Sequence, residues 1–175
     1  MNKNTAFASE AEQMDHVRTV IDSMTADMRD HPDPRLAMEA MLEAVAKAVC
    51  AEAGTLWFYH RFEDGRISPM AVYGGGELEG IYLLPGEGIA GQVVDSGEAL
   101  VIPDCRQDTR WTGKVDTETG YVTRTVLCVP LKTEGMVFGA IQLINKAEGR
   151  AFDRQDLAFT QQLAQEISHR VQDHP

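Results

Sequence analysis

The stretch LPGEGIAGQV, residues 84–93, fixes the middle of the fold. Glycines on both sides of Glu87 favour a tight loop, and the apolar run that follows is closed by Gly97. This pattern predicts a loop that leads into a short helix over residues 89–94. Backbone N–H groups in the first turn of a helix lack partners, so the start of this helix, near Ile89, suits a bound anion.

Strands are expected on both sides of this loop and helix. Aromatic and β-prone side chains precede it, with a hairpin turn signal at Asp64-Gly65. A second apolar hairpin turns at Glu134-Gly135. The polar segment 104–123 lies between them, and a connection of this length in a compact domain is usually functional or mobile. The expected strands are 55–60, 67–73, 99–102, 125–131 and 137–145.

Three long helices complete the pattern. Residues 35–50 and 153–172 each carry an apolar stripe at helical spacing. Residues 8–30 show an apolar 3-4 alternation, which is typical of a helix that packs on another helix. That partner is either the helix's own domain or a second copy of the chain, and the pattern fits both. The alternating residues are Met14, Val17, Ile21, Met24 and Met28.

The order of these elements predicts an α+β fold. We expect a central antiparallel sheet of about six strands, flanked by helices, with the long N- and C-terminal helices packed together. Residues 1–34 are expected to form an N-terminal helix and linker, which is a candidate dimer seam. Residues 35–172 are expected to form the folded domain.

Composition excludes several classes of function. The net charge is −11, and no Lys and Arg cluster of the kind that phosphate backbones require is present, which argues against nucleic-acid and anionic-membrane partners. The three cysteines, Cys50, Cys105 and Cys128, are odd in number and follow no secretory signal, which indicates reduced thiols and a cytoplasmic protein. No apolar run reaches the roughly 18 residues of a membrane span.

Three motifs together resemble the GAF family. LPGEGIAGQV resembles the signature before the family's central helix. Val101-Ile102-Pro103-Asp104, with Asp108, Arg110 and Trp111, is similar to the segment that follows it, with Trp111 in place of the usual Phe. Residues 126–131 and 139–146 resemble the last two strands. The resemblance covers about residues 35–172 and implies a regulatory, ligand-binding domain.

A narrower resemblance is to the GAF domains of cyclic-nucleotide phosphodiesterases and adenylyl cyclases. The segments 113–116 and 119–124 look like the crossover loop and short helix of those domains. Four of the five positions of their N-K…F…D-E motif are also matched, by Asn145, Lys146, Phe152 and Asp156, while Leu157 stands where the family has Glu. The resemblance implies that this motif supports the fold, with Lys146 and Asp156 as an ion pair.

The same resemblance implies a set of ligand contacts. The ligand would be cyclic AMP or cyclic GMP, and no other cofactor or metal is expected. Backbone N–H groups near Ile89 would hold the cyclic phosphate, while Gln142, where relatives often have Glu, would face the purine. Tyr73 is followed by Gly74, where guanine-selective relatives have an acidic residue, so the choice of purine stays open. The expected contacts are Thr55, Tyr73, Ile89, Ala90, Asp116, Thr119, Thr123 and Gln142.

These features predict a small-molecule sensor that signals through its terminal helices as a homodimer, without catalysis. Two alternatives stay open: a ligand-free dimerisation or interaction module, and a thiol-based redox sensor. For the redox sensor the expected thiol is Cys105, because it lies in the polar segment near Arg106, whereas Cys128 is expected in a core strand. Some GAF proteins reduce free methionine sulfoxide, but Ala90 stands here where the resemblance requires a cysteine.

Overall fold

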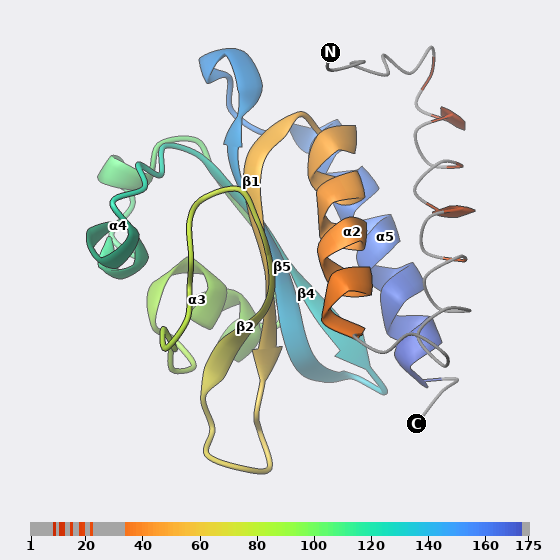
Figure 1. Ribbon diagram of the computed structural model, residues 1–175, viewed down its shortest axis with the longest axis horizontal. Helices are drawn as coiled ribbons and strands as arrows, with labels where there is room; N and C mark the ends of the chain where they lie inside the picture. The colour runs from red at the N-terminus through yellow and green to blue at the C-terminus, as the bar shows by residue number, and fades with distance from the viewer. Residues whose placement is uncertain are drawn as a thin grey trace.

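The computed structural model describes residues 34–172 and, before them, residues 9, 11, 12, 15, 18, 19 and 22. One five-stranded sheet runs through the described part, in the order β2-β1-β5-β4-β3, and every neighbouring pair is antiparallel. The two longest strands, β1 and β5, lie next to each other near the middle of the sheet (Figure 1). The strands are β1 (Ala51–Tyr59), β2 (Ile67–Tyr73), β3 (Leu100–Ile102), β4 (Val126–Thr133) and β5 (Met136–Lys146).

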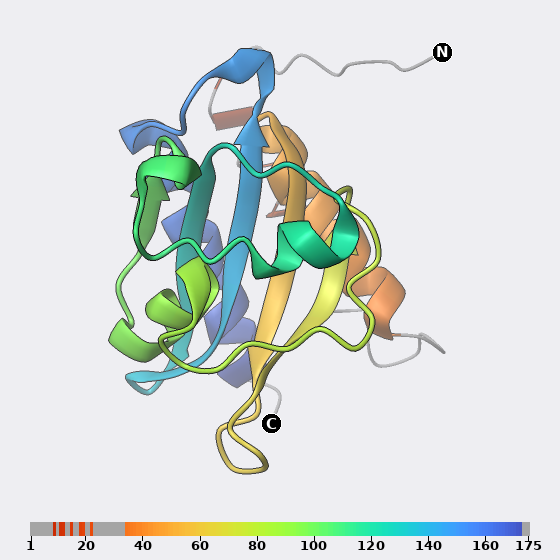
Figure 2. The ribbon, with the colours of Figure 1, turned by 90° about the vertical axis from the view of Figure 1, so that its left-hand side faces the viewer.

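Helices cover both faces of the sheet. The long helices α2 (Pro34–Ala48) and α5 (Arg154–Gln172) lie side by side on one face. The short helices α3 (Gly88–Ser96) and α4 (Lys114–Thr119) lie on the other face, and Figure 2 looks onto them. Two single-turn helices, Cys105–Gln107 and Ala147–Gly149, complete the described elements. The molecule therefore has three layers with the sheet in the centre.

Each face of the sheet has its own hydrophobic core. Because side chains alternate along a strand, Leu56 and its neighbour Ile141 pack against α2 and α5. Trp57 and its neighbour Ala140 point the other way, toward α3. Gly54 lies inside β1 because a Cβ there would come within 3.2 Å of Leu42 on α2 and of Leu143 on β5. The close packing of α2 on the sheet depends on this glycine.

The structure confirms the α+β fold and the expected strands, with two differences. The sheet has five strands where about six were expected. The first strand begins at Ala51 instead of residue 55, because Cys50 ends α2 with a left-handed backbone (φ 55°) and the chain enters the sheet at once. The predicted helix over residues 8–30 lies largely outside the described residues, so its packing against the C-terminal helix and its role in dimerisation stay predictions.

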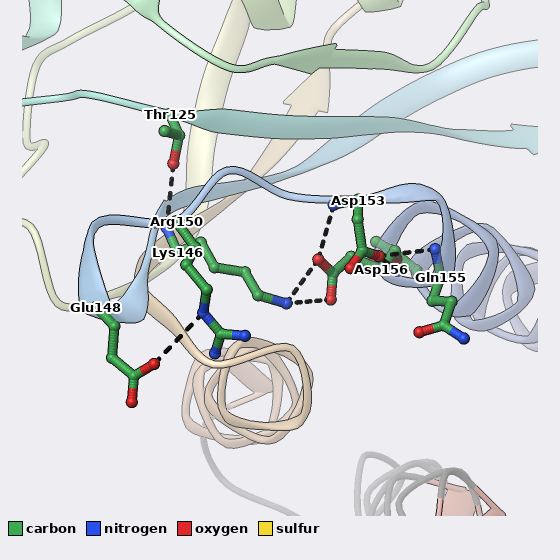
Figure 3. Close-up of polar contacts among 8 residues, drawn as sticks. Thr125, Lys146, Glu148, Arg150, Asp153, Gln155 and Asp156 are labelled. Carbon is green, nitrogen blue, oxygen red and sulfur yellow. Dashed lines mark hydrogen bonds and ion pairs between the residues drawn. The ribbon is translucent and has the colours of Figure 1, made fainter.

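The expected ion pair is present where β5 meets α5. Lys146 Nζ lies 2.5 and 2.6 Å from the two carboxylate oxygens of Asp156, and both side chains are buried (Figure 3). The ring of Phe152 lies beside Lys146, with its centroid 6.0 Å from Nζ. The side-chain oxygen of Asn145, Oδ1, accepts hydrogen bonds from the backbone N–H groups of Arg124 (2.7 Å) and Thr125 (3.3 Å). The four motif residues thus join the end of β5 to the start of both β4 and α5.

We predict that Asp156→Asn destabilises the domain strongly, because it leaves the buried Lys146 ammonium without a counter-charge. Removing one partner of a buried ion pair costs about 3–5 kcal/mol, and the midpoint of urea unfolding measures the change. The matched control is Glu148→Gln, which breaks the solvent-exposed pair of Glu148 with Arg150 and should cost less than about 1 kcal/mol. Equal midpoints for the two variants would contradict the assigned role of the buried pair.

Candidate ligand-binding site

The floor of the site is a row of side chains that crosses the centre of the sheet. Thr55 on β1 lies opposite Gln142 on β5, and Gln142 lies opposite Cys128 on β4. Thr55 and Cys128 are buried, whereas Gln142 is partly exposed. The α3 face of the sheet therefore carries two polar side chains in a surface that is otherwise apolar.

A small cavity lies above this floor. The start of α3 forms one wall, and the segment from Trp111 to Asp116, which includes the start of α4, forms the roof. The cavity volume is about 50 Å³. The lining residues are Thr55, Trp57, Leu83, Gly88, Ile89, Ala90, Trp111, Thr112, Gly113, Lys114, Val115, Asp116, Thr123, Gln142 and Ile144.

Asp116 fastens the roof at one end. Its Oδ2 accepts the backbone N–H of Thr123 at 2.7 Å, and its Oδ1 accepts the Thr123 hydroxyl at 2.6 Å. Hydrogen bonds to a carboxylate are about twice as strong as neutral ones. The Asp116 carboxylate and the Thr123 hydroxyl thus bond to each other. In this arrangement they hold α4 in place and are not available to a ligand in the cavity.

Lys114 fastens the other end of the roof. Its Nζ donates to Glu87 Oε1 at 2.9 Å and to the carbonyl of Tyr82 at 2.8 Å, and it lies 5.0 Å from the centroid of the Tyr82 ring. Glu87 also accepts the Leu84 N–H at 2.9 Å. The hydrogen bond from Lys114, more than any other contact, lowers the pKa of Glu87, because it favours the ionised carboxylate.

The signature loop brings Glu87 to this position. The Gly86 N–H donates to the carbonyl of Gly91 at 2.9 Å, so the loop folds back onto the first turn of α3. A Cβ on Gly91 would lie 2.5 Å from the Leu84 carbonyl oxygen, which explains why glycine is needed there. Glu87 is the N-cap residue of α3 but makes no side-chain capping bond. The N–H groups of the first turn therefore gain no acceptor from it.

Besides these polar contacts, the partly buried side chains of Trp111 and Val115 pack the roof against the core on this face. Helix α4 has six residues, and none of them is buried. Small-molecule pockets usually have volumes of about 300–1,000 Å³, far above the 50 Å³ of this cavity. A ligand of nucleotide size fits only if α4 moves away from the floor.

The structure brings together six of the eight residues expected at the ligand site. Two do not reach the cavity. Tyr73 packs with the core under α2 and α5, while its neighbour Val72 faces α3. The hydroxyl of Thr119 donates to the Val115 carbonyl and accepts the Tyr121 N–H. The six that line the cavity are Thr55, Ile89, Ala90, Asp116, Thr123 and Gln142.

A β-bulge explains the position of Tyr73. Counting by two from Ile67, which faces α3, would place Tyr73 on the same face. However, Leu56 pairs with Ala71 and Trp57 pairs with Pro69, so Met70 is an extra residue in β2. An extra residue moves all later side chains to the opposite face. Tyr73 therefore joins the other core.

Trp57 and Lys114 were missed as site residues. The signal for Trp57 was its position two residues after Thr55 on the same strand, which puts both on one face. Its indole Nε1–H donates to Gln142 Oε1 at 3.1 Å. Nothing in the sequence indicated the contacts of Lys114, because its partners Tyr82 and Glu87 are about thirty residues earlier in the chain.

The cysteines differ from expectation. Cys105, expected near the surface, is fully buried, and burial raises the pKa of its thiol to about 12, with further increases from Asp116, Asp108 and Asp104. Cys128 is buried as expected, and burial also raises the pKa of its thiol. Cys50 is the exposed thiol. The expected surface position of Cys105 is therefore wrong, and its buried thiol has neither the lowered pKa nor the access that a reactive thiolate needs.

No three or more His, Cys, Asp or Glu side chains in residues 34–172 or the few described earlier ones are grouped as metal ligands. No helix in the same part of the chain combines the length and apolar character needed to cross a membrane.

The chain resembles several known proteins. The model of the GAF domain family matches residues 33–171. A probable 3′,5′-cyclic phosphodiesterase of Caenorhabditis elegans is 46% identical over 70 residues, which are 40% of this chain and 10% of that protein. The dual 3′,5′-cyclic-AMP and -GMP phosphodiesterase 11 of Drosophila melanogaster is 47% identical over 72 residues, 41% of this chain and 5% of that protein. The chain thus matches a tenth or less of these relatives.

Solved structures share the fold at low sequence identity. The GAF domain of a phosphoenolpyruvate-protein phosphotransferase from Coxiella burnetii has a TM-score of 0.75 at 20% identity, covering 94% of this chain and 96% of that one. A free methionine-R-sulfoxide reductase from Neisseria meningitidis has a TM-score of 0.70 at 17% identity, covering 94% and 92%.

We predict that Asp116→Ala loosens α4 without unfolding the sheet. Loss of the two bonds to Thr123 should speed hydrogen exchange of the amides in residues 114–123 by about tenfold or more, because bonds to charged groups each contribute about 1.5–3 kcal/mol. Exchange in β1 and β5 should stay unchanged. Glu118→Ala, an exposed position on the same helix, is the matched control. Equal exchange in both variants would contradict the role of Asp116.

We also predict that a single thiol reacts in the native protein. A small aromatic disulfide reagent should label Cys50 quickly, and Cys105 and Cys128 only after denaturant is added, because buried thiols are protonated and shielded. Cys50→Ser should abolish the fast phase. A fast phase that persists in this variant would show that Cys105 or Cys128 is accessible.

Proposed function

Because the chain belongs to the GAF domain family, we propose that it is a small-molecule-sensing regulatory domain whose ligand is a purine cyclic nucleotide. The observation that carries the proposal is that six residues from four separate segments, chosen by resemblance to cyclic-nucleotide domains, meet at one cavity. The phosphodiesterases that match are named for cyclic AMP and cyclic GMP. The short match to them supports a binding role and carries no part of their catalytic activity to this chain.

The chemistry of the cavity suits such a ligand once the roof has moved. The first turn of α3, next to Ile89 and Ala90, offers N–H groups and the positive end of the helix dipole to a phosphate monoanion. Thr55 and Gln142 offer a hydroxyl and an amide from the floor. Asp116 and Thr123, released from each other, become free to bind the ribose or the base. The proposal assigns no chemical step to any of these groups.

A route leads from the roof to α5. Thr123, which holds Asp116, is followed by Arg124, whose N–H donates to Asn145 at the end of β5. Lys146 comes next and pairs with Asp156 in the first turn of α5. A movement of the roof is thus passed to α5 through adjoining contacts. A ligand shifts the balance between the closed and the open roof by its different affinity for these two arrangements. We propose that α5, together with the N-terminal helix, carries the signal to a second copy of the chain.

One observation favours the competing function of a ligand-free interaction module. A cavity of about 50 Å³ is already nearly filled by the domain's own side chains. In that case the polar bonds of the roof serve stability alone, and no metabolite stabilises the domain. Thermal unfolding with added nucleotides separates the two functions.

We predict that saturating cyclic AMP or cyclic GMP raises the melting temperature by several degrees. A ligand at about 100 times its Kd adds about 2.7 kcal/mol, which for a domain of this size is a shift of several degrees. Thr55→Val removes the floor hydroxyl at nearly constant shape and should reduce the shift. Thr133→Val, in the β4–β5 hairpin away from the cavity, is the control and should keep the full shift.

No change in melting temperature with either nucleotide would contradict the proposed function and favour the ligand-free module. A shift that is equal in wild type and Thr55→Val would place the nucleotide outside this cavity.

A further inference from the structure

The hydrogen bond between Trp57 and Gln142 fixes how the Gln142 amide is oriented. An indole N–H can only donate, so the amide must turn its oxygen toward it. Trp57 is buried on the α3 face of β1, with 2% of its surface exposed, and its Nε1 lies 3.1 Å from Gln142 Oε1. The reversed amide would place N–H groups of both side chains against each other. The amide orientation therefore follows from the donor-only character of the indole N–H.

The other end of the amide is directed to the cavity. Gln142 lines it and is the single partly exposed residue in β5 between Gly139 and Lys146. Its Nε2 makes no hydrogen bond to any residue in the described part of the chain. The Gln142 amide thus keeps N–H groups that no residue in the described part of the chain accepts.

We infer that Trp57 is a positioning residue that makes Gln142 an N–H donor to the ligand, so that the site selects a hydrogen-bond acceptor at this point. The choice between purines that follows from this inference rests on the proposed function, namely that a purine cyclic nucleotide binds in the cavity. A 6-oxopurine offers two adjacent acceptors, O6 and N7, whereas a 6-aminopurine offers an acceptor beside a donor. A glutamine that reads adenine presents its oxygen and its N–H to the base together, and here the oxygen is turned toward Trp57. The site therefore favours the oxo purine.

The binding test compares cyclic IMP with cyclic AMP. These nucleotides differ only in the oxo or amino group at C6 and the proton on N1. Titration calorimetry of the whole chain should give about tenfold tighter binding of cyclic IMP, because one hydrogen bond plus an avoided unpaired donor is worth about 1.4 kcal/mol. Equal affinity, or tighter binding of cyclic AMP, would overturn the inference.

Two variants separate positioning from packing. Gln142→Glu keeps the shape but turns a carboxylate oxygen to the cavity, and it should reverse the preference toward cyclic AMP. Trp57→Phe frees the amide to rotate and should bring the affinity ratio close to one, a readout that lost packing alone does not move. Gln161→Glu, an exposed position on α5, controls for the added charge and should keep the wild-type ratio. An unchanged ratio in Gln142→Glu would overturn the inference.

A second test needs no nucleotide. The NMR signal of the Trp57 indole N–H is assigned by its loss in Trp57→Phe. In the wild type this N–H should exchange slowly with solvent. In Gln142→Leu its signal should move upfield and its exchange should be faster. An indole signal that is identical in wild type and Gln142→Leu would overturn the positioning by Trp57. If neither nucleotide binds, the proposed function fails, and this indole measurement still decides whether the amide is held as inferred.

Discussion

The sheet has two faces, and the alternation of side chains along β1 and β5 decides what each face does. On one face the alternation buries Leu56 and Ile141 beneath the long helices α2 and α5, which supplies a conventional apolar core. On the other face it places Thr55, Trp57 and Gln142 beneath α3 and α4. Among these polar groups, the buried Trp57 indole N–H is satisfied by Gln142 Oε1, and the Gln142 side chain lines the small cavity. Stability and recognition are thus divided between the two faces of one element.

The roof over the polar face is built differently from the rest of the molecule. Helix α4 buries none of its side chains, and it is held by Asp116 with Thr123 and by Lys114 with Glu87 and Tyr82. Segments with few buried apolar contacts open at a fraction of the global unfolding free energy. Under the proposed function, the same charged contacts that close the cavity are the ones that a ligand has to replace. An exchange of this kind, polar group for polar group, lets a small molecule change the position of α4 without disturbing the core.

Sequence patterns predicted the order of helices and strands along the chain, because periodicity and turn residues mark each element. The resemblance to the GAF family, which rests on contiguous motifs, predicted the Lys146–Asp156 pair and most of the cavity residues. Tyr73 was expected at the ligand by resemblance alone, and the extra residue Met70, which the resemblance does not reveal, turns it to the opposite face. The Thr119 hydroxyl donates to the Val115 carbonyl in its own helix. The periodicity of the sequence does not reveal this local bond. Cys105 lies in a polar segment yet is buried, because its backbone pairs with Arg124 and draws it under the roof. The bond between Trp57 and Gln142 joins residues 85 positions apart, and pairs of that separation emerge only in the fold.

The central claim is that the cavity beneath α4 is a binding site that opens to take a nucleotide. A crystal structure of the chain grown with saturating cyclic GMP tests it most directly. The account predicts the nucleotide between α4 and the floor, its phosphate at the first turn of α3, and the bonds between Asp116 and Thr123 broken or shared with the ligand. A closed cavity with those bonds intact, and the nucleotide absent or bound elsewhere, would contradict it.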